Sequence, residues 1–95
     1  MRLRPSLVSW TLDRAIAHTS ASKRAVTAVQ RLMRDKKPRT DTQIWFAVSD
    51  YSYPVSASTL RHARLVLEMV GKVKDTGTRA SSGHNRGTER VWVWT

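Results

Sequence analysis

The side chains best able to recognise another molecule are basic, and they gather toward the two ends of the chain. Lysine and arginine together number 17, against 7 aspartate and glutamate residues, which gives a formal net charge of +10. The net charge is +8 over residues 1–40, −1 over residues 41–71 and +3 over residues 72–95. So large a positive excess favours a polyanionic partner, and nucleic acid is the usual one.

The residue types that support catalysis or metal binding do not occur at useful spacings. The three histidines, His18, His62 and His84, are far apart, and no pair has the i, i+4 spacing of a metal site on a helix. The acids form no paired-carboxylate motif, and neither a phosphate-binding loop nor a dinucleotide fingerprint is present. Cysteine is absent, which excludes disulfides and thiolate zinc sites. We therefore expect no enzymatic activity, no metal and no cofactor.

Hydrophobic periodicity predicts four helices within a single domain over residues 1–95. A period near 3.6 residues places them at about Ser6 to His18, Ser22 to Lys36, Asp41 to Ser49 and Ala57 to Val70. Ser20 or Ser22 can cap the second helix, and Thr40 with Gln43 has the spacing of a capping box for the third. Ser56 suits the N-cap of the fourth helix, and Gly71 suits its C-terminal end.

Beyond Gly71 the period changes to two, which predicts a β-hairpin over residues 72–95. Lys72 to Lys74 and Glu89 to Trp94 alternate as strands do, and Asp75 to Thr88 between them contains three glycines, which is typical of a long loop. Trp92 and Trp94 share one strand face. Core packing or a dimer surface is the favoured interpretation of them over stacking on unpaired bases.

The order of helix, short helix, turn, helix, glycine and hairpin resembles the winged helix-turn-helix superfamily. The similar stretches are Thr40-Asp41-Thr42-Gln43-Ile44, Val55 to Leu60 and Leu67 to Val73. The pattern, over roughly residues 20–95, is similar to multiple-antibiotic-resistance-type regulators and to small phage or mobile-element regulators. The turn before the fourth helix and the loop of the hairpin are both longer than the tightest versions of this fold use.

This resemblance implies an α+β, mostly helical fold. Residues 20–71 would form a three-helix core, residues 1–19 an additional N-terminal helix, and residues 72–95 the wing. It also implies a double-stranded DNA-binding protein, either a small transcription regulator or a phage or mobile-element accessory factor. We expect a cytoplasmic location, in a bacterium or a phage-infected host cell, and no membrane partner, because no apolar run is long enough to span a bilayer.

In such proteins the helix at residues 57–70 would enter the major groove and read bases with residues near its N-terminal end. The candidates for base reading are Ser56, Ser58, Thr59, Arg61 and His62. The candidates for phosphate contact are Arg64, Lys36, Lys37, Arg39, Thr40, Lys72 and Lys74. The loop at residues 75–88 would act as the wing, with Arg79, His84, Arg86 and Arg90 as its contacts.

Other interpretations of these residues stay open. Ser58 and Thr59 also suit an ordinary helix start, Arg61 suits a solvated surface, and the wing residues suit a plain surface loop. A winged helix can serve as a protein-interaction module, because fold does not fix function. RNA or structure-specific nucleic-acid binding is a further alternative, and the N-terminal helix is a candidate for a homodimer contact.

Overall fold

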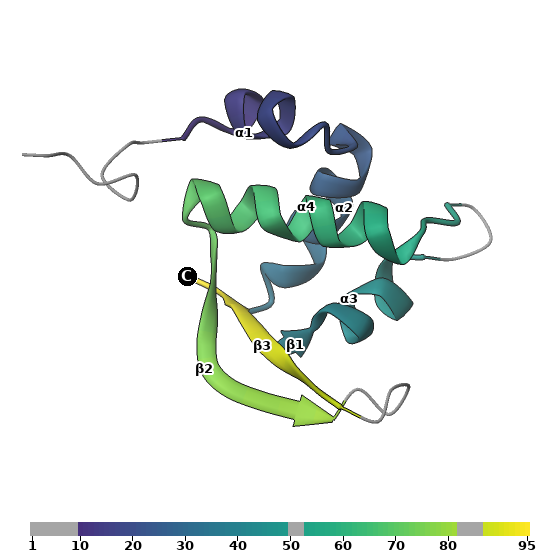
Figure 1. Cartoon of the computed structure of the whole chain (residues 1–95), viewed down its shortest axis with the longest axis vertical. Helices are drawn as coiled ribbons and strands as arrows, with labels where there is room; N and C mark the ends of the chain where they lie inside the picture. The colour runs from purple at the N-terminus through teal and green to yellow at the C-terminus, as the bar shows by residue number, and fades with distance from the viewer. Residues whose placement is uncertain (1–9, 50–52, 82–86) are drawn as a thin grey trace, which may run out of the picture.

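The chain folds as an α+β structure in which helices pack over one face of a small antiparallel sheet. The computed structural model describes residues 10–49, 53–81 and 87–95. Within them lie four helices and three strands (Figure 1). Their order is α1 (Leu12–Thr19), α2 (Lys23–Met33), β1 (Arg39–Thr40), α3 (Asp41–Val48), α4 (Ala57–Val70), β2 (Val73–Ser81) and β3 (Thr88–Trp94).

Each of the four helices begins at a serine or threonine whose side-chain oxygen accepts a hydrogen bond from a backbone amide in the first turn. These N-caps are Thr11, Ser22, Thr40 and Ser56. Without these caps, the backbone amides in the first turn of each helix would have no hydrogen-bond partner within the helix. The predicted capping box is confirmed, because Gln43 accepts from the Thr40 amide while Thr40 accepts from the Gln43 amide.

The fourth helix has the bounds that the sequence predicts, whereas the first two are shorter. Gly71 ends α4 with a φ of 85°, in the left-handed region that glycine adopts without strain. The predicted start of the first helix at Ser6 lies outside the described residues, and Trp10 and Thr11 are not helical. The second helix ends at Met33 rather than Lys36, because Lys36 has a φ of 66°.

The sheet has the strand order β1–β3–β2, and both of its pairings are antiparallel. Strand β1 was not predicted from the sequence. It pairs Arg39 with Trp92 and Thr40 with Val91. Residues 34–36, expected to be the end of the helix, are therefore not helical: residues 34 and 35 form a turn, and the strand begins at Arg39.

The hairpin is more regular than predicted, because β2 continues through the first half of the expected loop. The register between β2 and β3 shifts between Asp75 and Arg79, at a bulge where Gly77 has a φ of 84°. The Asp75 carboxylate accepts a hydrogen bond from the Gly77 amide at 2.9 Å and holds this bulge. The expected loop at residues 75–88 is thus reduced to the short connection between Ser81 and Thr88. We call the paired strands β2 and β3 the arm.

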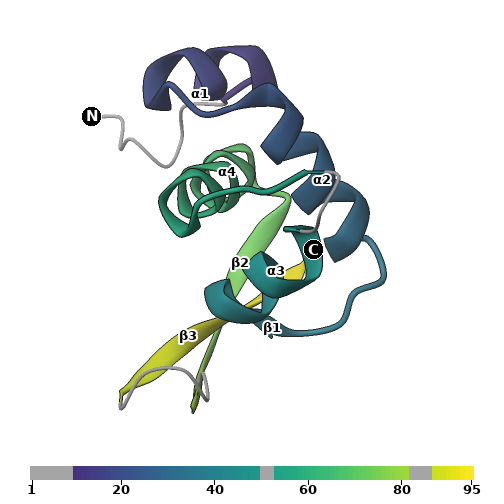
Figure 2. The same ribbon diagram turned by 90° about the vertical axis from the view of Figure 1, so that its right-hand side faces the viewer.

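One hydrophobic core joins the helices to the sheet. All four helices contribute buried residues to it, as do Val73 and Trp92 of the sheet, and Trp10 packs against it. The helices lie above the sheet, and the end of the arm projects away from them (Figure 2). Within the described residues, no helix combines the length and the apolar character needed to cross a membrane.

Candidate nucleic-acid interface

The connection that leads into α4 is held by side chains of α3 and of the segment after it. The Trp45 indole donates to the Val55 carbonyl oxygen at 2.7 Å, and the Val55 amide donates to the Ser49 hydroxyl at 3.1 Å. These two bonds satisfy both backbone polar groups of Val55. They fix the start of α4 relative to α3, even though the turn is long.

Four of the five predicted base-reading residues are exposed, namely the N-cap Ser56 and three residues in the N-terminal half of α4, while Thr59 is half-buried. Ser58, Arg61 and His62 are exposed, while Leu60 and Ala63 of the same turns are buried in the core. Ser56 and Thr59 are engaged with each other, since the Ser56 hydroxyl donates to the Thr59 hydroxyl at 2.8 Å and accepts from the Thr59 amide at 3.0 Å. These two residues act first as the helix cap.

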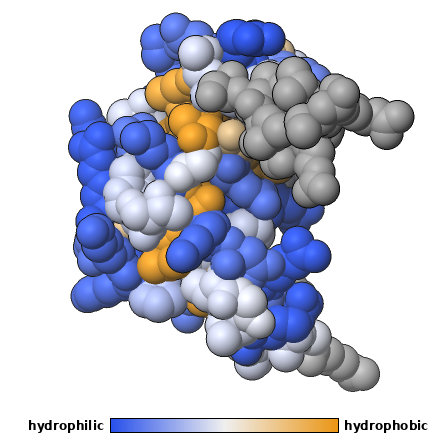
Figure 3. All heavy atoms as spheres, turned by 90° about the vertical axis from the view of Figure 1, so that its left-hand side faces the viewer, coloured by the Kyte–Doolittle hydropathy of each residue, from blue (hydrophilic) through white to orange (hydrophobic). Residues whose placement is uncertain are grey.

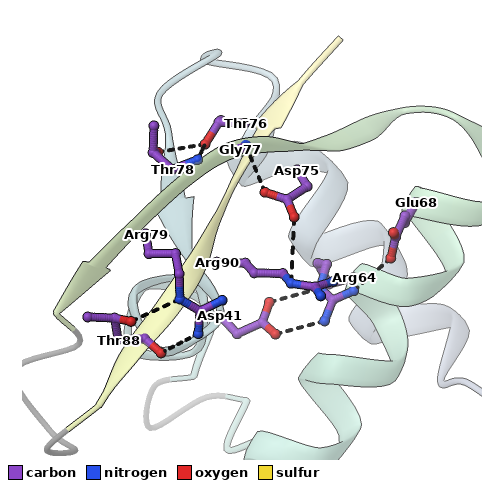
Figure 4. Close-up of polar contacts among 10 residues, drawn as sticks. All are labelled: Asp41, Arg64, Glu68, Asp75, Thr76, Gly77, Thr78, Arg79, Thr88 and Arg90. Carbon is purple, nitrogen blue, oxygen red and sulfur yellow. Dashed lines mark hydrogen bonds and ion pairs between the residues drawn. The ribbon is translucent and has the colours of Figure 1, made fainter.

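Arg64, predicted to contact phosphate, is instead committed to the interior of the fold. Its guanidinium donates to both carboxylate oxygens of Asp41 at 2.9 Å and to Glu68 at 2.9 Å. It also lies 4.0 Å from the centre of the Trp92 ring, and only 12% of its side chain is exposed. Figure 4 shows the Arg64 guanidinium between the carboxylates of Asp41 and Glu68. Arg64 is therefore not part of the candidate interface.

Arg39 and Thr40, also predicted phosphate contacts, are likewise used within the chain. The Arg39 guanidinium forms two hydrogen bonds to the Asp35 carboxylate, at 2.8 and 2.7 Å. Together with a hydrogen bond from the Lys37 amide, this holds the pKa of Asp35 well below its usual value of 3.8 and raises the pKa of Arg39. Thr40 is fully buried.

Lys36 and Lys37 are exposed but lie apart from the outward face of α4. They belong to the segment between α2 and β1, which is on the opposite side of the molecule from α4 in Figure 2. A flat or gently curved ligand that contacts α4 and the arm would not reach this segment. The fold thus separates Lys36 and Lys37 from the outward face of α4, although both were predicted to contact DNA phosphates.

The arm also carries exposed basic residues. Lys72 and Lys74 are exposed at its base, and Arg79 and Arg90 face each other directly across the strands. Arg79 donates to the Thr88 hydroxyl and carbonyl oxygens, and Arg90 pairs with Asp75 at 3.6 Å (Figure 4). Two like charges opposite each other on a sheet repel, and a bound anion would relieve that repulsion. His84 and Arg86 lie outside the described residues.

Three of the acids around α4 and the arm are paired with arginines: Glu68 and Asp41 bind Arg64, and Asp75 binds Arg90. One Glu89 carboxylate oxygen accepts from the Thr42 amide at 3.4 Å, and the other is buried without a hydrogen-bond partner in the described part of the chain. Among the described residues, Arg61, Lys72, Lys74 and Arg79 have no acidic partner. The positive charge of these residues is therefore open to an external anion.

One residue of this surface, Leu65, was not predicted from the sequence. It is 37% exposed, although every other leucine of α4 is buried. It lies one turn after Arg61, off the apolar stripe formed by Leu60, Ala63 and Leu67. That departure from the stripe is the feature of the sequence that could have identified it.

Within the described part of the chain, no group of three or more histidine, cysteine or acidic residues is placed to hold a metal ion. No family model matches the chain, and neither the curated proteins nor the solved structures give a significant match.

Proposed function

We propose that this protein is a winged helix-turn-helix that binds double-stranded DNA, with α4 in the major groove and the arm as the wing. The observation that supports this most is the placement of charge. The outward face of α4 and the arm both carry exposed basic residues, and three of the acids around them are paired with arginines. DNA-binding helices use residues near their N-terminal end to reach base edges, and phosphate contacts supply affinity and register.

The order of elements supports the same proposal. The series α2, β1, α3, α4, β2, β3, with strand β3 between the other two, is the arrangement expected of a winged helix. On this proposal the helix-turn-helix consists of α3 and α4, and α1 is an addition to it. The apolar face of α1 packs on the core of its own chain through Ala15, so a homodimer contact through this helix would have to use its exposed residues.

Binding of a labelled mixed-sequence duplex, measured by fluorescence anisotropy at several salt concentrations, tests the proposal. Phosphate contacts from three cationic side chains, Lys72, Lys74 and Arg79, predict a slope of about −3 in a plot of log binding constant against log salt concentration. A single-stranded oligonucleotide and an RNA duplex of the same sequence are the controls. Absence of duplex binding at low salt, or a preference for either control, would contradict the proposal.

A protein-interaction module is the second candidate function, and one observation favours it. Phe46 on α3 is 60% exposed. On the side that faces the viewer in Figure 3, opposite to the side seen in Figure 2, separate patches of hydrophobic atoms also reach the surface. Exposed aromatic residues are common anchors of protein interfaces. If Phe46→Ser leaves duplex binding intact but abolishes a protein complex isolated from cells, the second function holds beside the first. If the variant retains both the duplex and the complex, Phe46 is not such an anchor.

A further inference from the structure

We propose that Leu65 reads the methyl group of a thymine, and that the protein therefore prefers sites with a thymine close to a guanine in the major groove. This inference rests on the proposed function and names a specificity determinant within it. The proposed determinant is a contact between one apolar side chain and one methyl group of the DNA. Leu65 is not one of the residues that pack against the hydrophobic core, and it is 37% exposed on α4.

The position of Leu65 on the helix is central to the outward face. Ser58, Arg61 and Leu65 follow one another at intervals of three and four residues, so their side chains line one side of α4. Leu60, Val66 and Leu67 are buried on the core side of the same helix. A ligand that contacts Arg61 along the helix axis would therefore meet Leu65 in the next turn.

The chemistry of the major groove gives this apolar side chain a specific counterpart. Base edges in that groove present hydrogen-bond donors and acceptors, and the C5 methyl group of thymine is the apolar feature among them. Leucine has no polar atom with which to satisfy a donor or acceptor. Placed against one, it would remove water without replacing the lost hydrogen bond. Of the groups on the base edges of the major groove, the thymine methyl is therefore the most favourable contact for Leu65.

Spacing connects this contact to Arg61. Four residues along an α-helix advance about 6 Å, and stacked bases are about 3.4 Å apart. Arg61 has no acidic partner among the described residues, and arginine pairs with the O6 and N7 atoms of guanine through two hydrogen bonds. The methyl read by Leu65 should thus lie one or two base steps from the guanine read by Arg61.

The test begins with selection of bound sequences from a random duplex pool by the full chain. Each thymine of the enriched site is then replaced singly by uracil, which removes only the C5 methyl group. We expect one replacement to weaken binding about fourfold, the value for burial of one methyl-sized group. The Leu65→Ala variant should bind the thymine and uracil duplexes equally, and alanine preserves the helix.

Phe46→Ala is the matched control, because among the described residues it removes the other large exposed apolar side chain and leaves α4 intact. It should retain the fourfold preference for thymine. If the wild-type protein binds duplexes with the expected salt dependence but no uracil replacement weakens binding, the inference fails and the proposed function stands. Duplex binding without enrichment of any sequence would also overturn the inference alone. Absence of all duplex binding would overturn both.

Discussion

Arg61 and Arg64 stand three residues apart on α4 and have opposite surroundings. Arg61 is exposed and has no acidic partner in the described part of the chain, whereas Arg64 bonds to Asp41 and Glu68 and covers the Trp92 ring. The two residues look alike in the sequence. Their difference comes from packing, since Arg64 points toward α3 and the sheet. One arginine thus maintains the fold while the other remains available to a ligand.

Replacing each arginine by methionine separates these roles. Arg64→Met leaves the partly buried Asp41 carboxylate and the more exposed Glu68 carboxylate without their cation. We expect the free energy of unfolding in urea to fall by about 2 kcal/mol. Arg61→Met should change it by less than about 0.5 kcal/mol but should weaken duplex binding. Equal losses of stability from the two variants would contradict the assignment.

The Asp35–Arg39 pair gives a prediction about pH. Folding lowers the pKa of Asp35 from its value of 3.8 in the unfolded chain, so the ionised carboxylate stabilises the folded state at pH values above 3.8. This stabilisation is lost as the pH falls from 3.8 through the lower pKa that Asp35 has in the folded state. Asp35→Asn should therefore melt at a lower temperature than wild type at about pH 7, and the difference should shrink at about pH 2. Arg39→Gln should behave in the same way. A difference that does not change with pH would rule this pair out as the cause.

Among the helices and strands, Gly77 sets the shape of the arm. Its φ of 84° is needed for the bulge, and a Cβ atom there would meet no other atom within 4 Å. The cost of Gly77→Ala is therefore backbone strain alone, about 1 kcal/mol in urea unfolding. Gly87→Ala is the control, because Gly87 is equally uncrowded but has no positive φ. If both variants unfold at the same urea concentration, Gly77 is not needed for the bulge.

The sequence predicted best those elements whose defining interactions are between residues close together in the chain. The bounds of α4 were predicted correctly because Ser56 and Gly71 are local determinants at its two ends. Strand β1 has only two residues and exists through its pairing with β3, about fifty residues later in the chain. The continuation of β2 was missed because Gly77 resembles a turn residue, and its strand character depends on pairing with β3.

The sequence predicted which residues of α4 are exposed, but it did not predict which of the candidate contact residues bond to other parts of the chain. Exposure of Ser58, Arg61 and His62 followed from the phase of the helix. The commitment of Arg64 could not be foreseen, because its partner Asp41 lies on another helix, 23 residues earlier. The separation of Lys36 and Lys37 from α4 likewise needs the three-dimensional arrangement of α2 and β1.

Over the whole molecule, the positions of the basic residues predict which of them would contact a bound duplex. Lys72→Gln with Lys74→Gln removes two charges from the base of the arm, and Lys36→Gln with Lys37→Gln removes two from the opposite side. The first pair should make the salt-dependence slope less steep by about 2, and the second should leave it nearly unchanged. The opposite pattern, or equal effects, would show that DNA approaches from another side.

The division of α4 between Arg64 and its outward residues also bears on how this protein could acquire new preferences. The side chains that hold the helix in place, Leu60, Arg64 and Leu67, are distinct from those at positions 58, 61, 62 and 65. The four outward positions can therefore be substituted together without changing the side chains that hold α4 in place. A library randomised at those four positions should yield mostly folded members, each with its own choice of ligand.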